Sequence, residues 1–418
     1  MGPSGNAICA RTFIVRVFLD RNVPFVRSNL ILHLEDLYGK MVNTKMVNGD
    51  STLIKRKDPR STEGMKAYTG YFAQGNVDKL GQGTAEEEKA RLKDYQSLVS
   101  GYYDGVTDVF ENGWGQCWHF CTFYKGEPFK QAIARYEHYL ALRIGITPGS
   151  KVLDVSHYSH VINVNRARMS KQAGCGVGGP ATEIARFTDA HVTGVTINAH
   201  QVKKANRYAA EKGLSHQLKF VQGDFMSLVD TFGENTFDYV FACEATVHAP
   251  DAKGCYSQIM RVLKPGGVFG MYEWVMTHRY DPSNPKHVEI ARQIEFGDGL
   301  PQMRTADQCK EAVLAAGLEI LYEEDLAERD CGKPWYYPLT GDIRQAQTFA
   351  DIFTVIRTTT LAMWLTCIFV GWLEFFRLAP KGTRDCVESL SVAAASLGEG
   401  GKLGIFTPMQ MIIARKPE

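Results

Sequence analysis

A run of closely spaced glycines is the first feature of the sequence with chemical meaning. The run reads Gly174-Cys175-Gly176-Val177-Gly178-Gly179-Pro180. Glycines let the backbone close around a ligand, and a helix that begins after them offers free N–H groups to a carboxylate. A predicted strand at 151–155, which contains Asp154, precedes the run, and a predicted helix at 181–187 follows it. This order is typical of the ligand-binding turn of a doubly wound α/β fold. Nicotinamide and flavin enzymes have a similar turn.

An aromatic cluster at residues 110–120 is the second feature. Its rings alternate with Gly113 and Gly115, which break any long helix, and so many rings are uncommon in an exposed loop. We expect the cluster to line an apolar space, and ordinary core packing is the alternative. Acidic residues stand beside it at Asp108 and Glu111.

The elements that must position these residues follow from the periodicity. A helix is predicted at 131–143, and a helix that begins after Thr84 has an acidic first turn. Strand signals then alternate with helix signals at 151–155, 191–195, 218–221, 237–242 and 267–272. Such alternation predicts a parallel sheet with crossover helices.

The composition excludes several classes of protein. The chain has 418 residues, 44% of them hydrophobic and 22% charged, with a formal net charge of +1. A nucleic-acid-binding role is therefore not expected. Ten cysteines are scattered along the chain, and Cys117 and Cys121 lack the second ligand pair of a structural zinc site, so we expect reduced thiols and no metal. Residues 1–83 are predicted to be an irregular, partly disordered leader.

Three further motifs resemble class I S-adenosylmethionine-dependent methyltransferases. They are Gly223-Asp224 after the third strand, 237–240 opening the fourth strand, and the helix, tight turn and strand around 261–267. The resemblance implies S-adenosylmethionine as methyl donor and a Rossmann-like core at 131–277. Asp224 would bind the adenine amino group, with a role as a turn or cap residue as its alternative. The other implied cofactor contacts are Asp154, Gly174, Cys175, Gly176, Gly178, Thr196, Asn198, Gln201 and Glu244, with Thr196, Asn198 and Gln201 facing the ribose.

An insertion at 156–173 departs from that family, in which the strand runs directly into the glycines. Strand-to-helix turns in such units usually have about 2–6 residues. We hypothesise that the segment is translated intron, since splice-donor and splice-acceptor codons can encode its borders, and we expect it to weaken cofactor binding. Sequencing the mature transcript tests this hypothesis, and finding the segment in every message would refute it.

Four sequence blocks resemble fungal and plant sterol 24-C-methyltransferases more specifically. They are 102–120, which contains Gly113-Trp114-Gly115; 243–250; 272–282, which contains Tyr272-Glu273-Trp274; and 404–409. In that family, a side-chain alkene carbon of the sterol attacks the sulfonium methyl, and the resulting carbocation shifts a hydride and loses a proton. Phe110, Asn112, Trp118 and His278 differ from the residues common in the family.

This chemistry implies roles for the aromatic and acidic residues. Aromatic faces stabilise a cation without trapping it, which suits Tyr103, Trp114, Trp118 and Phe120 as substrate-binding residues. The candidate acids and bases are Asp108, Glu111, Glu244, Glu273 and His248, and sequence does not choose the final base. As alternatives, Asp108, Glu111 and Glu244 cap helices and His248 packs structurally.

The remaining expectations concern the flanks and the partners. Residues 84–130 are expected to face the substrate, and 278–418 to form a C-terminal sterol methyltransferase domain. The apolar run 361–373 is too short to span a bilayer alone, so we expect contact with the membrane interface, with spanning or buried packing as alternatives. The resemblance implies a peripheral enzyme on the cytoplasmic face of the endoplasmic reticulum or lipid droplets, and a homo-oligomer. The rival functions are methylation of another lipid or isoprenoid, and an inactive sterol- or partner-binding protein.

Overall fold

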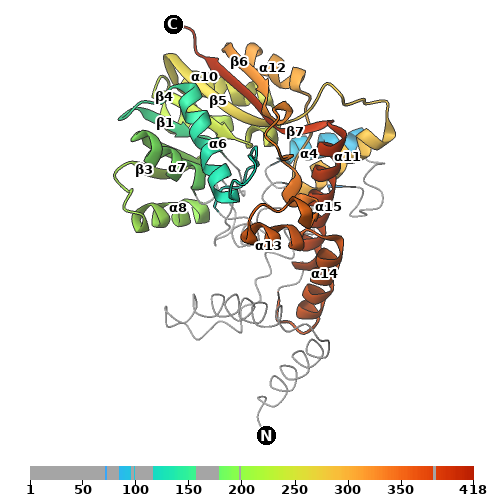
Figure 1. Cartoon of the computed structure of the whole chain (residues 1–418). Coiled ribbons are helices and arrows are strands. Elements are labelled where there is room, and N and C mark those ends of the chain that lie inside the picture. The colour runs from blue at the N-terminus through green and yellow to red at the C-terminus, as the bar shows by residue number, and fades with distance from the viewer. Residues whose placement is uncertain are drawn as a thin grey trace. The chain divides into compact units, whose positions relative to one another are not determined.

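The computed structural model describes residues 71–72, 84–95, 98, 116–156, 178–196, 199–379 and 383–418. Most of the predicted leader and most of the insertion at 156–173 lie outside these residues. The strands and helices of the described part are coloured along the chain in Figure 1.

A seven-stranded sheet forms the centre of the described part, in the order β3-β2-β1-β4-β5-β7-β6. The strands are β1 (Lys151–Asp154), β2 (His191–Thr196), β3 (Leu218–Gln222), β4 (Phe237–Cys243), β5 (Leu263–Met276), β6 (Glu319–Asp325) and β7 (Phe406–Arg415). The first five strands pair in parallel, and β7 lies antiparallel between β5 and β6. The predicted doubly wound sheet is confirmed. Strands β6 and β7 join it from the predicted C-terminal domain.

Helices cover both faces of the sheet (Figure 1). On one face lie α6 (Phe129–Ile144), α7 (Gly179–Thr188) and α8 (Ala199–Glu211), and on the other α9 (Leu228–Phe232), α10 (Ala252–Val262) and α12 (Ala306–Ala315). Two separate apolar clusters fill the two interfaces, as expected when near-continuous apolar strands are buried on both sides. At Gly270, an added Cβ would lie 2.2 Å from Ile144 Cγ2, so this glycine lets α6 approach β5.

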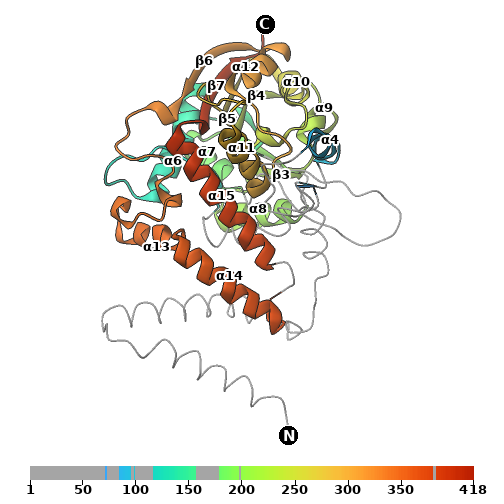
Figure 2. The same ribbon diagram turned by 90° about the vertical axis from the view of Figure 1, so that its right-hand side faces the viewer.

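The C-terminal helices form a second layer beside the carboxyl end of the sheet. Helix α15 (Thr383–Leu403) packs between α11 (Pro285–Asp298) and α14 (Thr360–Phe375), as Figure 2 shows. Helix α13 (Phe349–Arg357) precedes α14. In the part of the chain that the structure describes, no single helix has the length and hydropathy of a membrane span. Helices α13 and α14 pass that test only together, as a pair bent by 68°.

Helix α4 (Ala85–Lys93) has the predicted start. Thr84 and Glu87 form a reciprocal capping box, and acidic residues fill the first turn. From this helix, Arg91 reaches across to α11 and its guanidinium lies 2.8 Å from a Glu295 carboxylate oxygen. Arg91 also donates to the Pro301 carbonyl at 3.0 Å. The short helix is therefore tied to the loop that follows α11.

Candidate active site

Three polar residues mark the carboxyl edge of the parallel strands. Asp154 ends β1, Thr196 ends β2, and Asp224 follows β3. These strands are neighbours in the sheet, and their carboxyl ends lie beside the switch in strand order between β1 and β4, where ligands bind in doubly wound folds. The structure thus brings together three of the residues that we predicted from sequence to bind the cofactor.

Asp154 has an unusual environment for a carboxyl group. It is fully buried, and Ser156 N donates to Oδ1 at 2.8 Å. No described residue donates to its buried Oδ2. Burial raises the pKa of Asp154 to about 7. A buried carboxylate oxygen without a donor, such as Asp154 Oδ2, suits a cationic donor such as the ammonium group of S-adenosylmethionine.

The other predicted cofactor residues are only partly described. Gly178 precedes α7 with φ +80°, and a Cβ there would lie 2.5 Å from Phe220 Cζ, so both its conformation and its surroundings favour glycine. Gln201 is fully buried on α8. Asp224 accepts a hydrogen bond from Met226 N at 2.8 Å and caps the following turn. This is the role as a turn or cap residue that we gave as the alternative to cofactor binding. Gly174, Cys175, Gly176 and Asn198 lie outside the described residues.

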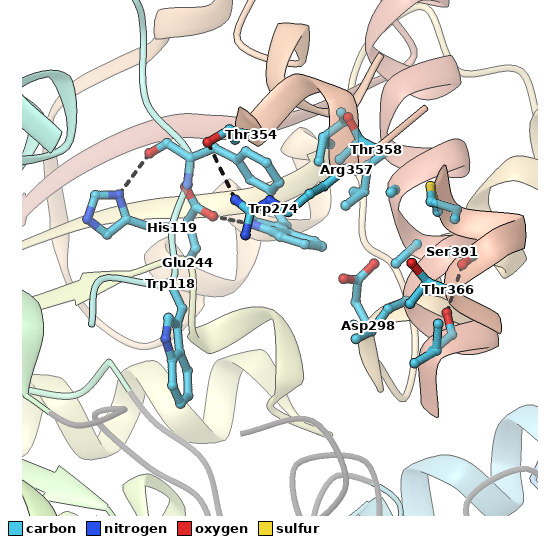
Figure 3. A pocket seen from close by; sticks show the side chains of 18 of the residues that line it. Trp118, His119, Glu244, Trp274, Asp298, Thr354, Arg357, Thr358, Thr366 and Ser391 are labelled. Atoms are coloured by element: carbon cyan, nitrogen blue, oxygen red, sulfur yellow. Dashed lines mark hydrogen bonds between the residues drawn. The ribbon is translucent and has the colours of Figure 1, made fainter. Parts of the chain in front are cut away.

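A largely apolar cavity of about 370 Å³ lies beside this edge (Figure 3). It is lined from the segment before α6, from the ends of β4 and β5, from α11 and from helices α13 to α15. The described lining residues include Trp118, Phe120, Glu244, His248, Trp274, Asp298, Met363 and Leu397. Four of the predicted site residues, Trp118, Phe120, Glu244 and His248, therefore meet in one cavity.

Glu244 is the acidic residue of the described lining whose side chain forms hydrogen bonds. Its carboxylate accepts from Phe120 N at 2.8 Å and from the Trp274 indole Nε1 at 2.7 Å. Burial raises its pKa to about 8, while the charge of His119 and the two donors act in the opposite direction. The backbone of Glu244 has φ +55°, a strained conformation that clusters at functional sites. Its alternative role as a helix cap is wrong, because Ala245 caps the following turn.

Glu273 does not join the cavity. Successive residues of a strand point to opposite faces of the sheet, so the side chain of Trp274 lines the cavity while that of Glu273 faces α10. There its carboxylate accepts from the Thr246 hydroxyl and, at 3.1 Å, from the Tyr256 hydroxyl. The structure thus separates Glu273 from the predicted catalytic group.

The aromatic cluster is partly described. Phe120 is buried against Trp335 and Trp274, with ring centroids 5.1 and 5.9 Å apart, and it also lines the cavity. It therefore belongs both to the core and to the cavity wall. Tyr103, Asp108, Glu111 and Trp114 lie outside the described residues.

Sequence reasoning missed a buried pair behind Glu244. His119 Nε2 lies 2.9 Å from Glu137 Oε1, and Nδ1 lies 2.8 Å from the Phe120 carbonyl. Burial disfavours the charged imidazole, but the hydrogen bond and charge of Glu137 raise the pKa of His119 overall. Together with Cys117, the pair offers three ligand atoms within 4.8 Å of one another, a possible metal site that already has an internal hydrogen bond. No local sequence pattern indicates this pair, because His119 lies in an irregular segment and Glu137 lies on α6.

Comparison with known proteins agrees with this architecture. The sterol methyltransferase C-terminal family matches residues 353–418, and a methyltransferase domain family matches residues 172–271. Among solved structures, the cyclopropane synthase MmaA2 from Mycobacterium tuberculosis superposes with a TM-score of 0.55 at 14% identity, over 78% of this chain and 98% of its own. A geranyl diphosphate methyltransferase superposes with a TM-score of 0.51 at 15% identity, over 77% of this chain and 99% of its own. At these identities the likeness concerns the fold alone.

Sequence comparison is more specific than the comparison of folds. The sterol 24-C-methyltransferase of Schizosaccharomyces pombe is 49% identical over 91% of this chain and 94% of its own length. That of Saccharomyces cerevisiae is 45% identical over 92% of both chains, and one from Gibberella zeae is 49% identical over 84% of this chain and 87% of its own. The chain belongs to the sterol 24-C-methyltransferase family of S-adenosylmethionine-dependent C-methyltransferases.

Proposed function

We propose that this chain transfers the methyl group of S-adenosylmethionine to C24 of a Δ24 sterol in ergosterol-type sterol biosynthesis. The observation that carries the proposal is the apolar cavity, with a buried carboxyl group and three rings at the carboxyl edge of the sheet. When bound, the cofactor supplies an electrophilic methyl group. Asp154, Thr196, Gln201 and Asp224 would hold it.

The described residues suit the chemistry of the acceptor. The π electrons of the sterol alkene form the new bond to the methyl carbon, which leaves a cation on the adjacent carbon. The faces of Trp118, Phe120 and Trp274 stabilise such a cation without bonding to it. After the hydride shift a proton must leave, and Glu244 is our candidate to accept it. Once it is ionised, the carboxylate of Glu244 is a stronger base than that of an ordinary glutamate, because its pKa is raised to about 8.

A panel of acceptors tests this proposal. The purified protein is incubated with S-adenosylmethionine and, separately, with Δ24 sterols, their saturated side-chain counterparts and acyclic isoprenoid alkenes. We expect a C24-methylated product from the Δ24 sterols only. Turnover of an isoprenoid but of no sterol would support the rival function. Tight sterol binding without any methylation would support the inactive binding protein.

We also propose that α13 and α14 lie in the membrane interface of the endoplasmic reticulum or lipid droplets. Large apolar side chains are exposed along both helices, including Phe349 (88% exposed), Trp364 (59%) and Phe375 (78%). Met363 and Thr366 of α14 line the cavity from the other side. A sterol that leaves the lipid beside α14 would therefore reach the cavity without crossing water. Arg377 and Arg384 near the end of α14 suit anionic headgroups.

Vesicle flotation tests the membrane proposal. The Phe369→Glu/Trp372→Glu variant removes two exposed apolar groups of α14, and Leu314→Glu is the matched control, because Leu314 is 51% exposed on α12. We expect the double variant to lose binding to vesicles of neutral and anionic phospholipids and the control to retain it. Equal flotation of both variants would contradict the proposal. Fluorescent tagging tests the predicted organelle, and sedimentation tests the homo-oligomer that family resemblance implies.

A further inference from the structure

Asp298 is a buried carboxyl group in the cavity wall to which the chemistry above assigns no role. It is the last residue of α11, is 8% exposed and lies among the lining residues in Figure 3. No described residue forms a hydrogen bond with it. Glu244, the other carboxyl group of the lining, has two donors.

The packing of α11 holds Asp298 in this position. A Cβ at Gly297 would lie 2.5 Å from Ala393 Cα, so α11 and α15 approach each other closely one residue before Asp298. Gly299, one residue after it, ends the helix with φ +68°. The following loop is fixed by Glu295, which accepts from Met303 N at 2.9 Å and pairs with Arg91. Asp298 therefore has little freedom to turn toward water.

The local structure makes no use of the carboxyl group. Negative charge is unfavourable at a helix C-terminus, and burial raises the pKa of Asp298 well above its ordinary value. Both effects disfavour the ionised form, and a neutral carboxyl group offers one donor together with acceptor sites. A buried polar group without a partner costs about 1–3 kcal/mol. A ligand that brings a hydroxyl group into the cavity would remove this cost.

Three hydroxyl groups of the lining already have acceptors for their protons. Thr366 donates to the Ala362 carbonyl at 2.8 Å, and Ser391 donates to the Val387 carbonyl at 2.8 Å. Thr358 donates to the Pro338 carbonyl at the same distance. Of the two carboxyl groups in the described lining, Asp298 is the one without a hydrogen bond to a described residue, and a sterol carries a single hydroxyl group, on the ring end opposite the alkene.

We infer that Asp298 binds the 3-hydroxyl group of the sterol. This inference rests on the sterol activity proposed above. A site built to bond a hydroxyl group discriminates strongly against an analogue that lacks it, because the protein group is then left unpaired. Asp298 is therefore a specificity-determining residue.

The test compares a Δ24 3-hydroxysterol with its 3-deoxy analogue by kcat/KM. In the wild-type protein we expect a preference of roughly 5- to 150-fold for the hydroxysterol, from about 1–3 kcal/mol at about 1.4 kcal/mol for each ten-fold change. In Asp298→Leu the preference should fall to about two-fold or less, mainly through a higher KM for the hydroxysterol. Asp298→Asn keeps a donor and an acceptor, so this variant should retain most of the preference for the hydroxysterol. Thr188→Val, which removes a hydroxyl bonded within α7 outside the cavity lining, should leave the preference unchanged.

Three results would overturn the inference. The first is a wild-type preference that persists in Asp298→Leu. The second is equal loss of kcat for both sterols in Asp298→Asn while S-adenosylhomocysteine and hydroxysterol binding are kept, since the carboxyl would then act at the reacting carbon. The third is a wild-type protein that methylates neither sterol, which would refute the proposed function as well.

Discussion

Replacing Trp274 by phenylalanine should change the ionisation of Glu244 while leaving an aromatic ring in the cavity. The indole Nε1 donates to Glu244 Oε2 at 2.7 Å, which favours the ionised carboxylate. A hydrogen bond to a charged group contributes about 1.5–3 kcal/mol. Since one pKa unit corresponds to about 1.36 kcal/mol, Trp274→Phe should raise the pKa of Glu244 by roughly one to two units above its value of about 8.

The pH dependence of kcat/KM measures this shift, because it reports groups of the free enzyme. If ionised Glu244 takes the final proton, activity is lost as the pH falls through its pKa, so the acidic limb should move to higher pH by the same one to two units. Trp335→Phe is the control. Trp335 also packs on Phe120, and another aromatic ring replaces it. An acidic limb that stays in place in Trp274→Phe would refute the role of Glu244 as base.

Three further predictions concern stability and cofactor binding. Arg91→Met leaves Glu295 buried without its ion partner and should lower the free energy of unfolding by about 3 kcal/mol in denaturant titration; an unchanged midpoint would contradict the pairing. Gly178→Ala must adopt φ +80° against Phe220 and should weaken S-adenosylhomocysteine binding about ten-fold or more in calorimetry; wild-type affinity would show that the turn tolerates a side chain. Deleting 156–173 should tighten the same binding, whereas equal tight binding with and without the segment would refute our hypothesis about the insertion.

The elements that sequence predicted well are those with strong local signals. Each strand of the parallel sheet is a short apolar run between turn residues, and Thr84 and Glu87 stand at the spacing of a capping box. The fifth strand begins earlier than predicted, because Leu263 already pairs with Phe237 of β4 before the turn that contains Gly266. Local sequence patterns therefore predict the parallel sheet and the carboxyl edge of its strands, where we expect the cofactor to bind.

The cavity was harder to predict because distant segments build it. Strand alternation could have placed Glu273 on the face opposite Trp274, but sequence alone did not show which face carries the cavity. Asp298 lies at an ordinary helix end, and its burial depends on α15, which begins 85 residues later. The pairing of His119 with Glu137 likewise crosses from an irregular segment to α6. Such contacts carry no periodic signal.

Methyl transfer to a sterol in the cavity beside Glu244 is the central claim. The most direct measurement is incubation of the purified protein, and of the form without 156–173, with methyl-labelled S-adenosylmethionine and a Δ24 sterol. We expect label on C24 of the sterol, and loss of that label in Glu244→Leu while S-adenosylhomocysteine binding remains. No labelled sterol from either form, or undiminished labelling in Glu244→Leu, would contradict the claim.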